Sequence, residues 1–270
     1  YGWGHYLQVG LAVKRATGGK VDFFSDPKTR TIMRFGTGLQ LVEGRAPDFA
    51  DGGGLVSDAV LLQGQLQWPE IPLTQSALDK DLLFGGPTVF FFRAFGQSGD
   101  IPPGRTEPLP MRTAFPFGQV WVMRPDPKSE ATPFCVGVKG GHNAEFHNHN
   151  DVGSYAVMFG GVMMSGDPGG TRYTGLTFSS KRYTIPLLSS YGHPVPVLNG
   201  CYQEAGRQYA AKIISSDFSD AKDRVVMDIA GAYPDKARVR SLVRTFEFDR
   251  AARRFSINDN VTFRMRRAHL

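Results

Sequence analysis

The stretch KGGHNAEFHNHNDVGSY, residues 139–155, lies between two runs of apolar residues that have strand character. Thr132–Lys139 before it and Ser154–Phe159 after it are rich in β-branched and aromatic residues, which favour extended backbone. Gly160 and Gly161 then separate the second run from Val162–Met164, a spacing typical of a β-hairpin. The polar stretch is therefore expected to connect strands of an antiparallel sheet.

Further strand-like runs continue this pattern on both sides of the central stretch. An earlier one covers Phe117–Arg124 and ends at a turn formed by Pro125–Pro127. Later runs, each bounded by turn residues, cover Arg207–Ser215, Arg224–Ala230, Arg238–Phe248 and Arg254–Phe263. Short strands at this spacing predict a β-sandwich or a large antiparallel sheet.

The N-terminal part has helical periodicity instead. Residues 1–18 form one amphipathic pattern, with Trp3, Tyr6, Leu7 and Leu11 on one face. Gly18 and Gly19 are typical helix stops. A lone helix of this length is marginal in water, so we expect it to belong to a larger helical layer, and the chain to be a piece of a longer protein.

Residues 20–110 give mixed signals. Asp48–Gly54 is expected to be a loop, and Ser57–Leu66 and Gln75–Leu83 to be short helices. Val89–Arg93 is compatible with either a buried strand or a helix end. We place the domain boundary after a linker, with residues 1–108 as one part and residues 109–270 as the β-sandwich domain.

Composition excludes several classes of protein. The 270 residues are 41% hydrophobic and 21% charged, which excludes global disorder. No apolar run approaches the roughly 20 residues of a membrane span. Two cysteines, Cys135 and Cys201, are too few for a disulfide framework or a multi-cysteine zinc site, and leave one disulfide or two buried thiols open. The 31 Lys and Arg residues exceed the 25 Asp and Glu residues by six. This positive net charge is compatible with an anionic partner or substrate, or with a basic protein whose charge has no binding role.

The most informative side chains lie in the pentapeptide from residue 147 to residue 151. On a strand edge, residues i, i+2 and i+4 share one face, which would place His147, His149 and Asp151 side by side. Imidazoles and carboxylates on one face can bind a divalent metal or transfer protons. The alternative is a polar loop with no ligand.

Two later residues could complete such a site. Asp167 follows an apolar strand in the turn Ser165–Gly170, and His193 lies in a short Tyr-Gly-His-Pro segment. Together with His149 they would form a nitrogen and oxygen donor set suited to zinc, supplied by three loops. Taken singly, Asp167 and His193 are both common turn residues.

The same residues carry a family resemblance. The stretch 139–155 resembles the signature of the heparinase II/III family of polysaccharide lyases. The strand ending at Val122–Arg124, the turn Asp167–Gly169 and the segment Gly192–Gly200 agree with it in order. The helix ending at Gly18 resembles the last helix of that family's toroid, so the resemblance covers nearly the whole chain.

The resemblance implies a fold and a reaction. It implies a mainly β chain: the terminal helices of an incomplete (α/α) toroid, followed by an antiparallel β-sandwich. It also implies β-elimination on a polysaccharide that contains uronic acid, with heparin, heparan sulfate or chondroitin as first candidates. The toroid itself is expected to lie upstream of residue 1. The 270 residues alone are then expected to have little or no lyase activity.

The resemblance also assigns roles to individual residues. His147 matches the catalytic histidine of the sandwich domain, and Tyr1 is the nearest candidate for the catalytic tyrosine. His149, Asp167 and His193 match the ligands of one structural zinc per chain, although another divalent metal would suit the same donors.

Basic and aromatic residues outside this set are candidates for contact with the polymer. Arg172 and Tyr173 are expected to bind the substrate, and Lys181 and Arg182 are further candidates. The late basic residues alternate along strands and are expected on an exposed face: Arg238, Arg240, Arg244, Arg253 and Arg254.

Two rival interpretations stay open. One is a cupin-type metal enzyme, since Gly141 precedes His147 and His149 at a cupin-like spacing, although the glutamate that should follow is missing. The other is a non-catalytic β-sandwich that binds carbohydrate. We expect neither nucleic acid nor a membrane as partner, and a polymer substrate implies secretion or a periplasmic location.

Overall fold

The structure is a computed structural model that describes residues 2–56, 58–73, 106–129 and 131–264. The chain divides into two compact units. The first contains residues 1–46 and 55–109, and the second contains residues 47–54 and 110–270. The loop 47–54 is thus grouped with the strands. Tyr1, the predicted helix Gln75–Leu83 and the ambiguous run Val89–Arg93 lie outside the described residues.

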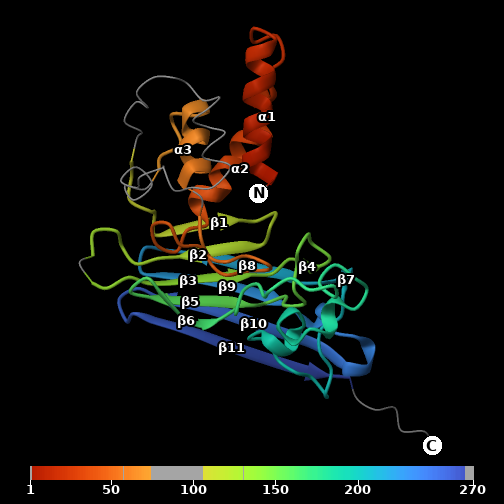
Figure 1. Cartoon of the computed structure of the whole chain (residues 1–270). Coiled ribbons are helices and arrows are strands. Elements are labelled where there is room, and N and C mark those ends of the chain that lie inside the picture. The colour runs from red at the N-terminus through yellow and green to blue at the C-terminus, as the bar shows by residue number, and fades with distance from the viewer. Residues whose placement is uncertain (1, 57, 74–105, 130, 265–270) are drawn as a thin grey trace, which may run out of the picture. The chain divides into compact units, whose positions relative to one another are not determined.

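The first unit is helical in its described part, with α1 (Gly2–Ala16), α2 (Pro27–Gly38) and α3 (Asp58–Gln67) (Figure 1). The predicted N-terminal helix is confirmed, and it stops just before Gly18 and Gly19, whose positive φ angles suit glycine. The predicted short helix after residue 57 is confirmed as α3.

Sequence periodicity did not predict α2. Its start is nevertheless encoded locally, because the Asp26 side chain accepts a hydrogen bond from Lys28 N and Pro27 occupies the first turn. The three helices bury one apolar cluster, formed by Leu7, Phe24, Met33, Leu61, Leu62, Trp68, Ile71 and Leu73.

The second unit is a β-sandwich. One sheet has the strand order β1-β2-β3-β5-β6, and the other has the order β11-β10-β9-β8. The first sheet contains β1 (Arg112–Phe115), β2 (Val120–Met123), β3 (Phe134–Lys139), β5 (Tyr155–Phe159) and β6 (Val162–Gly166). The second contains β8 (Lys212–Phe218), β9 (Lys222–Asp228), β10 (Val239–Asp249) and β11 (Arg254–Phe263). A small third sheet pairs β4 (His142–Asn143) with β7 (Gly206–Ala210).

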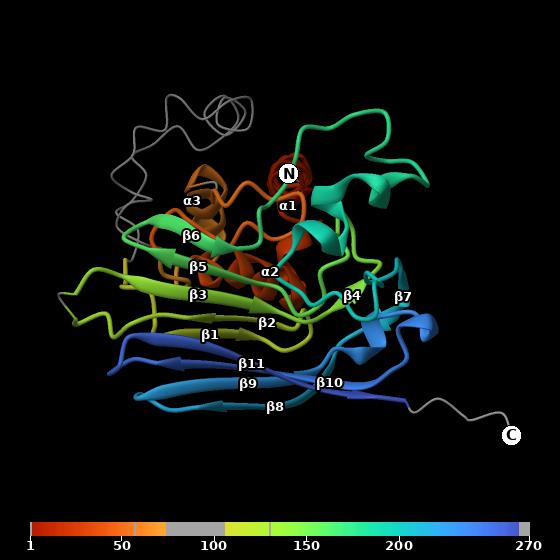
Figure 2. The same ribbon diagram turned by 90° about the horizontal axis from the view of Figure 1, so that it is seen from below.

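The two large sheets lie face to face, as Figure 2 shows. All their strand pairs are antiparallel. Side chains from both inner faces, among them Trp121, Val136, Met227 and Phe246, form one buried apolar cluster. Burying each such side chain stabilises the fold by roughly 1.5–3 kcal/mol. The predicted mainly β fold with an antiparallel sandwich is therefore confirmed.

The strand boundaries differ from the sequence prediction at two places. The expected strand Arg207–Ser215 is two strands, β7 and β8, which belong to different sheets. Ala211 separates them and donates its N–H to Gly141 O at 2.9 Å. The expected strand at Phe117 begins only at Val120, because residues 116–119 form a turn in which Gln119 has a positive φ.

Arg244 corrects the expectation that the late arginines all face solvent. It points inward from β10 and is only 4% exposed. Its guanidinium donates to both carboxylate oxygens of Asp259, at 2.8 and 2.7 Å, and to the carbonyls of Gly153 and Pro194. The other four arginines of that group are exposed.

Both cysteines are buried free thiols, so of the two possibilities left open the structure has two unpaired cysteines. In the described part of the chain, no helix combines the length and the apolar character needed to cross a bilayer.

Candidate metal and catalytic site

The segment that carries the two neighbouring histidines is a turn, not a strand edge. After β4 the chain turns at residues 144–147, and His147 adopts a left-handed conformation with φ of 60°. This turn directs His147 and His149 differently: the His147 side chain is 54% exposed, whereas His149 is fully buried. The expected alternation of residues 147, 149 and 151 on one face is therefore wrong.

His149, Asp167 and His193 do meet, as the family resemblance implied. One donor atom from each lies within 4.8 Å of the others, and all three side chains are buried. Asp167 directly follows β6, and His193 follows a short 3-10 turn at Ser190–Gly192. Three separate segments of the second unit thus supply the cluster.

Neighbouring groups hold the cluster in place. His193 Nδ1 lies 3.2 Å from Asp167 Oδ2, and His149 Nδ1 lies 3.1 Å from His193 Nε2. The two oxygens of Asp167 accept hydrogen bonds from Ser154 Oγ and from Gly169 N. Gly166, which precedes this aspartate, has φ of 115°, and a side chain there would overlap the Tyr155 carbonyl oxygen, so glycine suits this position for both reasons.

The donor atoms fit a divalent cation. Asp151 Oδ2 and His193 Nδ1 are buried, lie 3.9 Å apart and form no hydrogen bond in the described residues, although Asp167 Oδ2 lies 3.2 Å from His193 Nδ1. Buried polar atoms without a partner are costly, so such atoms indicate a missing ligand. Two imidazoles with one or two carboxylates are the donor types that zinc accepts.

The pKa values of the two buried aspartates, Asp167 and Asp151, are shifted in opposite directions. Burial opposes ionisation of Asp167, but its interactions with His193 outweigh burial and hold its pKa at about 2. Burial raises the pKa of Asp151 to about 6, although Lys139 Nζ lies 2.7 Å from its Oδ1. Burial lowers the pKa of His149 to about 4, so at neutral pH this imidazole is uncharged and able to bind a metal.

Asp51 is the residue that sequence reasoning missed. It lies in the loop 47–54, and its carboxylate contacts four side chains. Asp51 Oδ2 lies 2.9 Å from His147 Nδ1 and accepts from Tyr173 Oη at 3.2 Å. Asp51 Oδ1 lies 3.0 Å from His149 Nε2 and accepts from Arg182 Nη2 at 2.6 Å. The sequence signals were a carboxylate in a glycine-rich loop and the resemblance of segment 49–53 to part of the heparinase II/III family, and neither assigned Asp51 a role.

The same contacts correct the expectation for Arg182. This residue is buried and pairs with Asp51, so it is not free to contact a polymer. Its guanidinium also donates to the carbonyls of Thr177 and Asn148, which fixes the segment that follows Asp167 against the segment that carries the histidines.

The other predicted substrate contacts lie on the surface. Arg172 is exposed, and Tyr173 is 51% exposed. The Tyr173 ring packs edge-on against Phe178, which in turn packs edge-on against His147. Phe178 is itself 67% exposed. The exposed His147 ring therefore lies beside the aromatic side chains of Phe178 and Tyr173, while Asp51 contacts the Nδ1 atom of His147.

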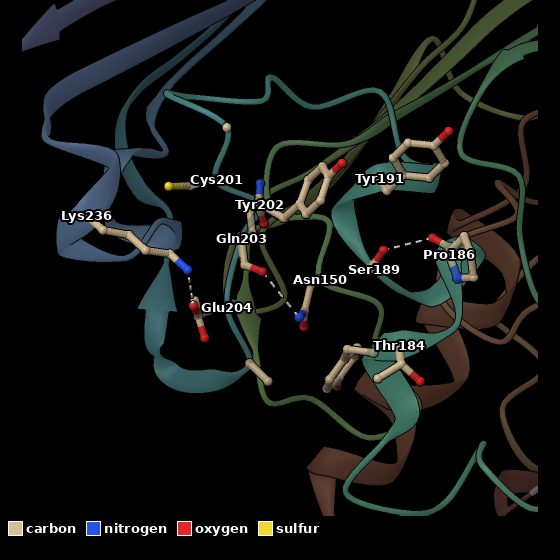
Figure 3. A pocket seen from close by; sticks show the side chains of 13 residues that line it. Asn150, Thr184, Pro186, Ser189, Tyr191, Cys201, Tyr202, Gln203, Glu204 and Lys236 are labelled. Atoms are coloured by element: carbon tan, nitrogen blue, oxygen red, sulfur yellow. Dashed lines mark hydrogen bonds and ion pairs between the residues drawn. The ribbon is translucent and has the colours of Figure 1, made fainter.

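A separate pocket of about 710 Å³ adjoins the segment 147–151 (Figure 3). Asn150 lies in its wall, and its buried Oδ1 has no hydrogen-bond partner in the described residues. Tyr191 and Tyr202 also line the pocket, with their rings 5.9 Å apart and nearly perpendicular. Glu204 and Lys236 form an exposed ion pair at the same pocket.

Comparison with known proteins gives one kind of match. No family model and no curated protein matches the sequence. The fold is similar to that of heparan sulfate lyase HepC from Pedobacter heparinus, with a TM-score of 0.59 and 15% identity over 96% of this chain. It is also similar to a heparinase III structure, with a TM-score of 0.58 and 17% identity over 87% of this chain.

These matches confirm the predicted resemblance at the level of the fold. A further heparinase III structure with methylated lysines covers 96% of this chain, with a TM-score of 0.60 and 16% identity. The chain spans only about a third of the length of each of these lyases, from 33% to 38%. These likenesses establish the fold of the chain, which is similar to part of the heparinase structures.

Proposed function

We propose that this chain is the end of the (α/α) toroid and the β-sandwich domain of a polysaccharide lyase that cleaves a uronic-acid-containing polysaccharide by β-elimination. The observation that carries the proposal is the exposed His147 imidazole, which is anchored by Asp51 directly beside the buried His149, Asp167 and His193. The heparinase-like fold supports the same conclusion.

The reaction needs a base close to an acidic carbon. The proton on C5 of a uronate lies next to the carboxylate, and its removal leaves an electron pair on C5 that the carboxylate delocalises. As this pair forms the C4–C5 double bond, the C4–O bond breaks and the leaving oxygen takes a proton. His147 Nε2 points away from Asp51 and is the atom that we assign to hold a proton or to contact the uronate.

Supporting roles follow from the same surface. We assign Tyr173 and Arg172 to substrate binding, because both are exposed on the segment that faces His147. Tyr1 stays the candidate for the catalytic tyrosine. A bound zinc would supply fixed positive charge that holds His149, Asp167 and His193 together, with another divalent cation as the alternative.

The substrate class follows from charge and from the neighbours. The chain carries a net charge of +6, and the similar structures are described as heparan sulfate lyase and heparinase III. A sulfated glycosaminoglycan such as heparan sulfate is therefore our first candidate, followed by chondroitin. A polymer of this kind places the protein outside the cell or in the periplasm.

Ultraviolet absorbance of the unsaturated product tests the proposal. Both the chain and a longer polypeptide that carries it should be incubated with heparan sulfate, chondroitin, hyaluronan and alginate. The longer polypeptide should give rising absorbance with one polymer, and the 270 residues alone should give little or none. A flat trace from the longer polypeptide with all four polymers would contradict the proposal.

A matched pair of histidine variants then tests the assigned base. His147→Ala should lower turnover by about 10²- to 10⁴-fold while the far-UV spectrum is unchanged. His5→Ala is the control, since His5 lies exposed on α1. Full activity of the His147 variant would remove this residue from the mechanism.

A non-catalytic carbohydrate-binding role is the second candidate, and the tyrosine-lined pocket favours it. Tyr191 and Tyr202 offer exposed aromatic faces, and Asn150 offers an unpaired acceptor, which together suit a sugar ring with its hydroxyls. Calorimetric titration with uronate oligosaccharides would show binding that Tyr191→Ala weakens and Tyr173→Ala does not. The opposite pattern would favour the lyase surface at His147.

A cupin-type enzyme has no support from the structure. The metal-binding group contains two histidines and one aspartate but no glutamate, and the matched folds are those of lyases.

A further inference from the structure

One carboxylate joins the exposed histidine to the buried histidine cluster. Asp51 Oδ2 lies 2.9 Å from His147 Nδ1, and Asp51 Oδ1 lies 3.0 Å from His149 Nε2. The two imidazoles therefore use different oxygens of the same group. Their sequence separation from Asp51 is 96 and 98 residues, so this arrangement is a product of the tertiary fold.

The contacts decide where each ring carries its proton. An ionised carboxylate can only accept hydrogen bonds, so the ring nitrogen that faces Asp51 must be the donor. Neutral His147 then carries its proton on Nδ1 and keeps a lone pair on the outward Nε2. Neutral His149 carries its proton on Nε2 and keeps a lone pair on Nδ1, the atom that lies 3.1 Å from His193 Nε2.

Asp51 is itself held rigidly. Arg182 Nη2 donates to Asp51 Oδ1 at 2.6 Å and to His147 O at 3.3 Å. The backbone N–H of Asp51 also donates to His147 O at 3.2 Å. On the other side, Gly170 N donates to Gly52 O at 3.1 Å, which connects the loop to the turn that follows Asp167. The left-handed backbone of His147 is thus fixed by the same loop.

We propose that Asp51 is a positioning residue that sets the tautomer and the orientation of His147 and His149 together. It holds the lone pair of His147 toward the exposed surface and the lone pair of His149 toward the cluster. A carboxylate behind a metal-binding imidazole is a known way to orient the ring and raise its basicity. The catalytic part of this inference rests on the proposed function, whereas the tautomers and the metal affinity do not.

The tautomers can be measured directly in the metal-free full chain. Long-range proton–nitrogen NMR spectra of the ¹⁵N-labelled protein, recorded at slightly alkaline pH, should show His147 protonated on Nδ1 and His149 protonated on Nε2. The opposite tautomer at either residue of the wild-type protein would overturn the proposal without any variant.

Asp51→Asn gives the sharpest perturbation, because an amide has one acceptor oxygen and one donor nitrogen. It can accept from only one of the two rings, so at least one imidazole should change tautomer. Titration with zinc alone should show binding weakened by about 10- to 100-fold, as expected when a residue that supports a ligand is lost. Asp217→Asn, at an exposed aspartate on β8 whose side chain contacts Ser215, is the control and should alter neither readout.

The outcomes separate this inference from the proposed function. Unchanged tautomers and unchanged zinc affinity in Asp51→Asn would reject the positioning role, even if lyase activity were found. Shifted tautomers and weakened zinc binding would support the role, even if all four polysaccharides gave no product. If Asp51→Asn does not fold, the wild-type tautomers still decide the question.

Discussion

Arg182 and Asp51 stand 131 residues apart in the sequence, yet Arg182 Nη2 donates to Asp51 Oδ1 across 2.6 Å. Their side chains are 10% and 5% exposed, so the ion pair is largely shielded from water. It connects the loop 47–54 with the segment that carries the metal-binding residues, both within the β-sandwich unit.

Arg182→Ala should therefore destabilise the β-sandwich unit. Removal of one partner leaves the Asp51 carboxylate buried without its cation, which typically costs about 3–5 kcal/mol. Urea unfolding measures this loss. Arg172→Ala is the control, since Arg172 is exposed and should change the free energy of unfolding by less than about 0.5 kcal/mol. Equal effects of the two substitutions would contradict the assigned role of the ion pair.

Metal analysis tests the buried cluster. Protein purified without chelator should contain about one zinc per chain. His193→Ala should weaken zinc binding beyond the roughly 10- to 100-fold that loss of a supporting residue costs, because it removes a ligand itself. His5→Ala should bind zinc as the wild type does. Absence of zinc, together with a melting temperature that chelator does not lower, would count against a structural metal.

Gly166→Ala tests how the turn positions Asp167. A side chain at Gly166 would overlap the Tyr155 carbonyl oxygen, and the φ of 115° is unfavourable for alanine. We expect a loss of about 2–3 kcal/mol in the free energy of unfolding, together with weaker zinc binding. At Gly161, where φ is 81° and the space is open, alanine should cost about 1 kcal/mol and leave zinc affinity unchanged. Similar zinc affinity in both variants would show that the turn at Gly166 does not position Asp167 for metal binding.

Cys135 should make the protein sensitive to alkali. Burial raises the pKa of its thiol from 9.0 to about 11. The folded state then keeps a proton that the unfolded state releases, so this contribution to stability is complete below pH 9 and is lost as pH rises toward 11. Between about pH 8 and pH 10 the wild type should lose about 1.4 kcal/mol more than Cys135→Ala. Buried Tyr233, whose pKa is also raised, affects both proteins alike. Arg124 interacts electrostatically with Cys135, so its titration contributes to the difference between the two proteins. Parallel stability curves would show that the thiol does not titrate as expected.

The sequence by itself predicted most strands of the two large sheets and, through a family resemblance, the residues of the candidate metal site. Alternating apolar residues and paired glycines fixed β5, β6, β10 and β11, because side-chain direction in a strand depends on neighbours in the chain. The resemblance to the heparinase II/III family grouped His149, Asp167 and His193, and the structure brings them together.

Only the tertiary structure decided which charged residues are buried and what they contact. Alternation along β10 placed Arg244 on one face but could not reveal that Asp259 and two carbonyls would satisfy it inside the protein. Asp51 and Arg182 look like ordinary loop residues, and their roles come from contacts more than 90 residues away in the sequence. The physical reason is that burial of a charge depends on a partner at hydrogen-bond distance, and local sequence does not specify a partner that the folding of distant segments supplies.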